Sequence, residues 1–194
     1  DLIESFARLP KLCSYAHLPM QSGSDRILRA MRRPYTMKRF MEIVGKLRQE
    51  CPSIRLSTDV IVGFPGETEE DFNATKEAFK ESDFTMGYIF KYSERSGTPA
   101  AQLEDKVPQE IKEQRNQELL ALLDGQSIAS NRKLMGLPME VLVEGRARKG
   151  EGKLMGRTRC FRKVIFEGST NLIGSLVDVQ IKDVSSSILK AIEA

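Results

Sequence analysis

Short apolar segments alternate with amphipathic helical segments over the first two-thirds of the chain. Three segments have the composition of strands, at 14–18, 55–62 and 86–92. The second contains the continuous apolar run Val60-Ile61-Val62, which is typical of a strand that is buried on both faces. Apolar residues recur at helical spacing between these strands, and Ser24, Thr36 and Thr68 stand where N-caps are expected. This alternation predicts a parallel α/β sheet or barrel.

The pattern changes after Gly136, where short apolar-polar alternations are separated by glycines. Pro108 begins a long polar helix that we expect to end near Lys133. The strands expected beyond it lie at 139–143, 153–159, 163–166, 176–183 and 187–191, and such a series is typical of a small antiparallel barrel. We therefore predict three parts: part of an α/β barrel at 1–107, a connector helix at 108–132 and a small all-β domain at 133–194.

Composition excludes several classes of protein. The 194 residues are 40% hydrophobic and 29% charged, so the chain can bury a core and is not disordered. No run of 18 apolar residues occurs, so we expect no membrane span. The three cysteines are far apart and there is one histidine, so we expect reduced thiols in a cytoplasm and no metal site within this sequence. The chain begins with Asp1 rather than Met, and we interpret it as a fragment.

Positive charge is concentrated in 130–165, which holds ten basic and three acidic side chains, while the whole chain carries only +3. A basic segment beside an acidic body favours polyanion binding, although a solvated basic face is the simpler alternative. Small five-stranded barrels often bind oligonucleotides, so we favour RNA over a structural cap on the larger domain. The candidate RNA-binding residues are Arg146, Arg148, Lys153, Arg157, Arg159, Arg162 and Lys163.

Polar residues directly after the predicted strands are the candidates for ligand contacts. Gln21, Ser22 and Ser24 follow the first strand, and in a parallel barrel the carboxyl ends of the strands line the active face. Asp59 and Ile61 lie on the same face of the second strand, because side chains alternate between the two faces. A carboxylate that is buried there needs a hydrogen-bonding or charged partner.

Other residues have simpler interpretations. Glu67 and Glu70 are expected to complement the dipole of the next helix. His17 is expected to make structural hydrogen bonds, and Tyr92 fits either the core or a pocket. The cysteines, Cys13, Cys51 and Cys160, are expected to be buried fillers.

Four ordered motifs resemble the methylthiotransferase family of radical-SAM enzymes: HLPMQSGSDRIL, STDVIVGFPGETEEDF, FKYSERSGTPAA and LMGRTR. The resemblance covers nearly the whole chain and implies the C-terminal half of a radical-SAM (β/α) barrel followed by a TRAM domain, an OB-like all-β barrel that binds RNA. It also implies two [4Fe–4S] clusters in the full-length protein. The family's CxxxCxxC motif is not in this sequence, so we expect no cluster ligand, no catalytic residue and no activity in this fragment.

The resemblance further implies a site for S-adenosyl-L-methionine (SAM). Its residues would be Gln21, Ser22, Arg33, Asp59 and Ile61, with Arg33 on the carboxylate and Ile61 near the adenine. Within the family, the motifs are most similar to the branch that adds a methylthio group to C2 of N6-isopentenyladenosine at tRNA position 37. Branches that modify threonylcarbamoyladenosine in tRNA or ribosomal protein S12 are the alternatives. The expected partner is tRNA, with no membrane and a monomeric state.

Two hypotheses from other classes stay open. The chain could be a non-catalytic RNA-binding module with the α/β part as scaffold, or a nucleotide-binding α/β protein, although the phosphate-loop pattern GxxxxGK[ST] is not present. A half barrel would leave an open strand edge and exposed apolar faces. We therefore expect the isolated α/β part to aggregate or be partly molten, and residues from about 135 onward to fold alone.

Overall fold

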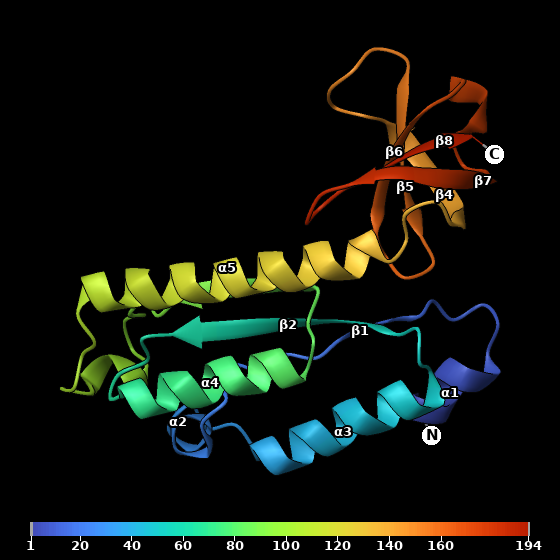
Figure 1. The fold of residues 1–194 in the computed structure, drawn as a ribbon. Helices are drawn as coiled ribbons and strands as arrows, with labels where there is room; N and C mark the ends of the chain where they lie inside the picture. Colours follow the sequence, from blue (N-terminus) through green and yellow to red (C-terminus); the bar gives the residue numbers. More distant parts are fainter. Residues whose placement is uncertain (1, 194) are drawn as a thin grey trace. The chain divides into compact units, whose positions relative to one another are not determined.

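The chain forms two compact units (Figure 1). The structure, a computed structural model, describes residues 2–193. The sheet unit comprises residues 16–52 and 56–123, and the barrel unit comprises the described residues up to 15, 53–55 and those from 124 onward. Within residues 2–193, no helix has both the length and the apolar character needed to span a lipid bilayer.

The sheet unit is built on three strands in the order β1–β2–β3, with bounds Tyr15–His17, Arg55–Val62 and Met86–Lys91. β2 and β3 run parallel, which confirms the predicted parallel α/β arrangement. Their register places Asp59 beside Tyr88 and Ile61 beside Phe90. Gln21 adds a parallel bridge to Val60, so the pairing on this side of β2 continues past β1.

The helices of this unit are α2 (Asp25–Ala30), α3 (Met37–Glu50), α4 (Glu69–Glu81), the 3-10 helix η1 (Pro99–Gln102) and α5 (Gln109–Arg132), whose last turns belong to the barrel unit. The three predicted N-caps are confirmed. Ser24, Thr36 and Thr68 each accept a hydrogen bond from a backbone N–H of the first helical turn, which satisfies a donor that the helix cannot satisfy itself.

The two faces of β2 differ in burial. Leu56, Val60 and Val62 are at most 1% exposed, and Figure 1 shows α3, α4 and α5 running alongside the strand. Asp59 and Ile61 point to the other face and are only half-buried. The expectation that the apolar run would be buried on both faces was therefore wrong, because the face with Ile61 opens onto a cavity.

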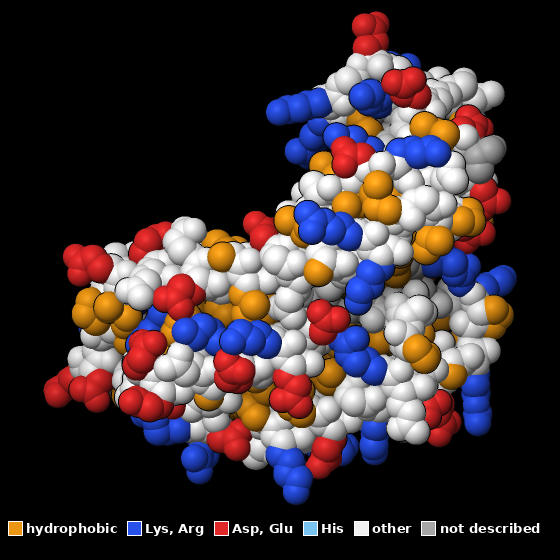
Figure 2. All heavy atoms as spheres, viewed as in Figure 1, with side chains coloured by type: hydrophobic (Ala, Val, Ile, Leu, Met, Phe, Trp, Pro, Cys, Tyr) orange, Lys and Arg blue, Asp and Glu red, His pale blue; other side chains and the backbone are white. Residues whose placement is uncertain are grey.

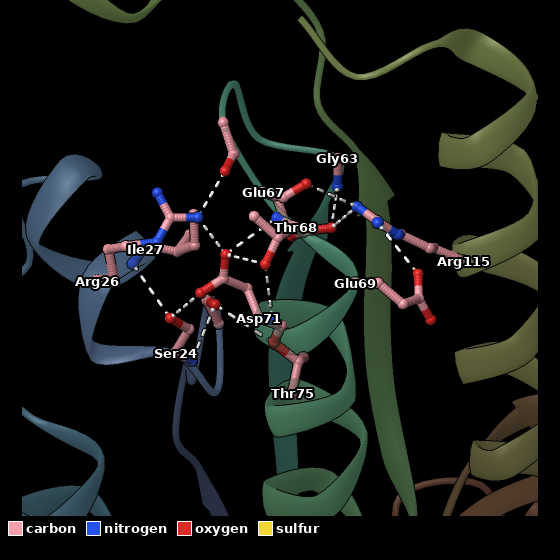
Figure 3. Close-up of polar contacts among 12 residues, drawn as sticks. Ser24, Arg26, Ile27, Gly63, Glu67, Thr68, Glu69, Asp71, Thr75 and Arg115 are labelled. Atoms are coloured by element: carbon pink, nitrogen blue, oxygen red, sulfur yellow. Dashed lines mark hydrogen bonds and ion pairs between the residues drawn. The ribbon is translucent and has the colours of Figure 1, made fainter. Parts of the chain in front are cut away.

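Two polar networks tie the turn after β2 and the start of α4 to other helices (Figure 3). In the first, the Asp71 carboxylate accepts hydrogen bonds from the Ser24 hydroxyl (2.6 Å), the Thr68 N–H (2.9 Å) and the Arg26 guanidinium. Burial raises the pKa of Asp71, but these hydrogen bonds outweigh it and lower the pKa to about 2. The carboxylate thus joins α2 to α4 in its charged form.

In the second network, Glu67 and Arg115 form a buried ion pair at 2.7 Å, with side chains 2% and 7% exposed. Glu67 also accepts a hydrogen bond from the Gly63 N–H at 2.9 Å, and Arg115 contacts Glu69 at 3.2 Å. Glu67 therefore links the turn to α5, which corrects the expectation that it would only complement the helix dipole. Its counterpart Glu70 is exposed on the first turn of α4.

The barrel unit contains a closed five-stranded barrel in the order β4–β5–β6–β8–β7. Its strands are β4 (Pro138–Arg146), β5 (Lys153–Thr158), β6 (Lys163–Glu167), β7 (Leu176–Val184) and β8 (Leu189–Glu193), with the 3-10 helix η2 (Thr170–Leu172) between β6 and β7. The unit also contains the short helix α1 (Leu2–Arg8), which the pattern did not predict. All neighbouring strands are antiparallel except β6 and β8, so the fully antiparallel expectation was wrong at this closing pair.

The barrel is filled by side chains such as Val141, Phe166 and Val179, each at most 2% exposed. Polar contacts join it to the last turn of α5. The buried Arg162 donates to Asn131 Oδ1 (2.8 Å) and to the Ser130 hydroxyl (2.6 Å).

The three cysteines do not all behave as expected. Cys51 and Cys160 are buried, but Cys13 is exposed in the barrel unit, so its assignment as a buried filler was wrong.

Gly156→Ala tests the packing of β4 on β5. A Cβ at Gly156 would lie 2.3 Å from the Leu142 carbonyl oxygen, which is backbone and cannot move without disturbing the strand pair. We expect a loss of about 2 kcal/mol in the free energy of unfolding of the barrel, as for other overpacked sites. Gly145→Ala is the control, because no atom lies within 4 Å of its Cβ. Equal urea-unfolding midpoints for the two variants would contradict this packing.

Asp71→Asn tests the first network. The folded pKa of about 2 lies below the ordinary value of 3.8, so Asp71 stabilises the fold above pH 4, and this contribution is lost as the pH falls to about 2. We expect the variant to be about 2 kcal/mol less stable at pH 7, with the difference from the wild type shrinking below pH 4. Thermal unfolding at several pH values measures it. Glu81→Gln removes an exposed charge from the last turn of the same helix and should leave this pH dependence in place.

Candidate functional site

A cavity of about 530 Å³ opens at the carboxyl ends of the three strands. Its lining comes from the ends of β2 and β3, from Gln21 after β1, from Arg33 after α2 and from the loop after β3. This is the edge at which α/β sheets bind ligands, and the volume is in the range of small-molecule sites. The lining residues are Gln21, Arg33, Asp59, Ile61, Phe90, Lys91, Tyr92, Ser93, Arg95, Thr98 and Ala100.

Gln21 is held rigidly at the wall of this cavity. Its backbone N–H donates to the Asp59 carbonyl (2.8 Å), and its carbonyl accepts from the Ile61 N–H (2.9 Å). Its φ of +64° is unusual for a residue other than glycine, and such strain often accompanies function. The Gln21 amide oxygen accepts a hydrogen bond from Arg33 Nη2 at 3.1 Å, so the two residues, twelve positions apart, meet in space.

Asp59 reaches the cavity from the middle of β2. Its side chain is 29% exposed, and Oδ2 lies 3.4 Å from His17 Nε2. The other ring nitrogen of His17, Nδ1, is 2.8 Å from the Ser57 hydroxyl. His17 therefore makes the structural hydrogen bonds that were expected, and it is the partner of the Asp59 carboxylate.

Tyr92 forms a fixed part of the cavity wall. Its hydroxyl is buried and has no hydrogen-bond partner among the described residues. Its ring is fixed by an edge contact with Phe64 (centroids 5.2 Å apart) and by Lys112 Nζ, 5.4 Å from the ring centroid. A buried hydroxyl without a partner costs about 1–3 kcal/mol, so the packing around Tyr92 holds the ring in place against an energetic cost.

The cavity continues into a smaller apolar hollow of about 230 Å³. Ile61, Tyr92 and Arg33 line both spaces, and Met31, Phe64 and Pro99 add apolar surface to the smaller one. A flat apolar group and a polar group could therefore occupy neighbouring parts of one ligand-binding region. This combination fits SAM, which carries an adenine, a ribose and an amino-acid end.

Ser22 lies apart from the other candidate SAM residues. It is fully buried and is not among the residues that line the cavity. Its hydroxyl lies 3.4 Å from the Thr75 hydroxyl and accepts a hydrogen bond from the Ser24 N–H at 3.2 Å. These contacts join the β1–α2 loop to α4, and they account for the residue without a ligand.

Sequence reasoning missed several cavity residues. Phe90 belongs to β3, and Arg95 and Thr98 belong to the loop after it. The rule that carboxyl ends of parallel strands share one edge would have pointed to all three.

The candidate RNA-binding residues divide into three groups in the barrel unit. Arg146 and Lys153 line a cavity of about 480 Å³ beside the β4–β5 loop, which also carries Arg148. Figure 2 shows Lys and Arg side chains gathered over this end of the barrel.

Arg157 lies on β5, Lys163 lies on β6 and Arg159 lies in the turn between them. Arg157 is 3.4 Å from Glu144 and stacks over Phe161, and Arg159 is 3.5 Å from Glu140, so both are partly neutralised. The register places Lys163 beside Arg157.

Arg162 corrects the expectation of phosphate contact. It is 9% exposed, and its guanidinium is occupied by Asn131, Ser130 and the Cys160 sulfur. Arg162 directly precedes β6, and its guanidinium reaches Asn131 and Ser130 in the last turn of α5, while Lys163 beside it is half-buried. Its role in this structure is to hold α5 to the barrel.

No group of three or more His, Cys, Asp or Glu side chains that could hold a metal ion occurs within residues 2–193.

Two family models match the chain in sequence order. The model of the radical SAM superfamily matches residues 1–79, and the model of the TRAM domain matches residues 132–192. The solved structure of coproporphyrinogen III oxidase from Escherichia coli, described as a radical SAM enzyme, is similar in fold. It has a TM-score of 0.50 at 14% identity, over 87% of this chain and 41% of that chain.

Curated relatives match nearly the whole chain. Proteins named tRNA-2-methylthio-N(6)-dimethylallyladenosine synthase from Opitutus terrae, Akkermansia muciniphila and Bordetella avium are 53%, 44% and 48% identical. These matches cover 97%, 94% and 97% of this chain but only 39%, 40% and 40% of the relatives, so the chain spans about two-fifths of their length. Together with the two family models, this identity shows that the chain belongs to the methylthiotransferase family of radical-SAM proteins.

Proposed function

We propose that this chain supplies the SAM site and the RNA-binding domain of a tRNA methylthiotransferase. The proposed reaction adds a methylthio group to C2 of N6-isopentenyladenosine at tRNA position 37. The observation that carries the proposal is the meeting of Gln21, Arg33 and Asp59 around one cavity at the carboxyl ends of the strands.

In this proposal, four of the residues that line the cavity have defined tasks toward SAM. Arg33 binds the carboxylate, with its guanidinium oriented by the Gln21 amide. Asp59, held by His17, accepts hydrogen bonds from a ribose hydroxyl or from the amino group. Ile61 packs near the adenine. We leave Ser22 out of the contact set, because its hydroxyl is already hydrogen-bonded next to α4.

The protein's contribution is binding and orientation. When bound, SAM and two [4Fe–4S] clusters supply the radical chemistry, the sulfur and the methyl group. We propose that the cluster ligands and the remaining catalytic groups lie in parts of the whole protein outside residues 2–193. The strained backbone of Gln21 fixes the SAM site against β2 and so limits the orientations that the bound molecule can take.

The barrel unit is the proposed tRNA-binding domain. Arg146, Arg148 and Lys153 carry exposed or half-buried charge at one end of the barrel, which suits contact with phosphates. Arg157, Arg159 and Lys163 extend this surface, and we leave out the buried Arg162. We further propose a domain division at residues 107 and 132, a monomeric state and a cytoplasmic location.

Arg33→Gln and Asp59→Ala test the SAM site in the whole protein. Removing a charge-assisted hydrogen bond typically costs about 1.5–3 kcal/mol, so we expect Arg33→Gln to raise the Kd for SAM about 10- to 100-fold. Asp59→Ala should weaken binding in the same direction. Isothermal titration calorimetry with SAM measures both. Arg39→Gln on the exposed face of α3 is the matched control, and unchanged affinity in Arg33→Gln or Asp59→Ala would remove that residue from the site.

The reaction is tested in a strain that lacks its methylthiotransferase. The gene for the whole protein is introduced, and digested tRNA is analysed by mass spectrometry. We expect 2-methylthio-N6-isopentenyladenosine to appear. If isopentenyladenosine stays unmodified while the protein is expressed with its clusters, the proposed substrate is wrong. The threonylcarbamoyl nucleoside and ribosomal protein S12 are then examined in the same strain.

A further inference from the structure

Two aromatic rings continue the wall of the SAM cavity along the open face of the sheet. Tyr88 and Phe90 of β3 are 55% and 52% exposed, and their rings stack with centroids 6.2 Å apart and planes inclined by 13°. The register places them beside Asp59 and Ile61, and Phe90 itself lines the cavity. Exposed apolar surface next to a polar cavity often marks a binding site.

The loop after β3 brings a free positive charge to the same place. Arg95 lines the cavity, and its guanidinium has no hydrogen-bond or ion-pair partner within residues 2–193. The neighbouring charges are neutralised, because Lys91 pairs with Glu113 and Glu94 pairs with Lys106. Arg95 is therefore the uncompensated cation on the β3 side of the cavity, as Arg33 is on the α2 side.

SAM does not supply a second anionic group that could pair with Arg95. SAM carries one carboxylate, and in the proposed function Arg33 binds it. A second anion must come from another molecule, and each nucleotide of an RNA chain presents a phosphate beside its base. Proteins that bind unpaired nucleotides combine aromatic rings, on which bases stack, with cations along the backbone.

We infer that Phe90 and Arg95 form the nucleotide subsite of the proposed methylthiotransferase. Phe90, backed by Tyr88, stacks on an unpaired base of the RNA, and Arg95 binds an adjoining phosphate. This inference rests on the proposed function, and it assigns the β3 side of the cavity to the RNA and the β1–β2 side to SAM. Both ligands then share one cavity, with the base held next to the SAM site.

The test uses the whole protein with its clusters and an anticodon stem–loop RNA that carries N6-isopentenyladenosine. Phe90→Leu keeps an apolar side chain but removes the ring, and we expect the Kd for this RNA to rise about tenfold. Arg95→Gln should also weaken RNA binding and reduce the slope of log K against log salt by about 0.7, the loss of one phosphate contact to a single strand. Phe90→Tyr should restore the affinity, because it restores the ring.

Two further measurements and a control variant separate the alternatives. SAM affinity and the melting temperature should stay at the wild-type values in Phe90→Leu and Arg95→Gln. Arg29→Gln removes an exposed guanidinium of α2 that does not line the cavity, and it should change none of the measured quantities.

The inference is overturned if the variants weaken SAM binding and leave RNA binding unchanged, because the surface then belongs to SAM. It is also overturned if the melting temperature falls while RNA binding is unchanged, because another segment of the whole protein then covers the rings. If the wild type modifies tRNA and both variants bind the RNA as the wild type does, this inference alone fails. If the wild type neither binds nor modifies the RNA, the proposed function fails and the subsite fails with it.

Discussion

The buried ion pair of Glu67 and Arg115 is the constraint on which the cavity depends. Glu67 also accepts the Gly63 N–H, so the turn after β2 is fixed to α5 by one carboxylate. That turn carries Phe64, whose ring meets Tyr92 edge-on and holds it at the cavity wall. Gly63 has no Cβ, and Lys112 Cγ would lie 2.3 Å from one, so the close approach of α5 requires a glycine there.

The two carboxylate networks near α4 differ in what they contribute to the fold. Hydrogen bonds dominate at Asp71 and lower its pKa, so this carboxylate stabilises the fold. Burial dominates at Glu67 and raises its pKa, even though the Gly63 N–H and Arg115 oppose the shift. A buried pair of this kind contributes little net stability, but losing one partner would leave a charge without compensation. We interpret the pair of Glu67 and Arg115 as a device that positions the turn rather than as a source of stability.

Local signals predicted much of the fold. Short-range chemistry predicts the helix caps at Ser24 and Thr68 and the strand β2. It also predicts the five barrel strands from their apolar-polar alternation, and the structure contains all of these elements. Gln21, Asp59 and Ile61 could be named because they follow a predicted strand or lie on one face of it, and the resemblance to a known family added Arg33 and the link to SAM. Contacts between distant segments could not be predicted, because neither partner signals the other. Arg162 on Asn131, 31 positions away, and Glu67 on Arg115, 48 positions away, are such contacts.

The strand pairs that close the barrel are expected to form slowly during folding. β4 pairs with β7 from Pro138 opposite Gln180, and β6 pairs with β8 across the whole of β7. Loops of this size must close before those pairs gain any hydrogen bonds, and such nonlocal topologies fold in milliseconds to seconds. α5 is local in sequence and can form far sooner. During synthesis, α5 would therefore form before the barrel. The barrel cannot close until its last strand, β8, has left the ribosome.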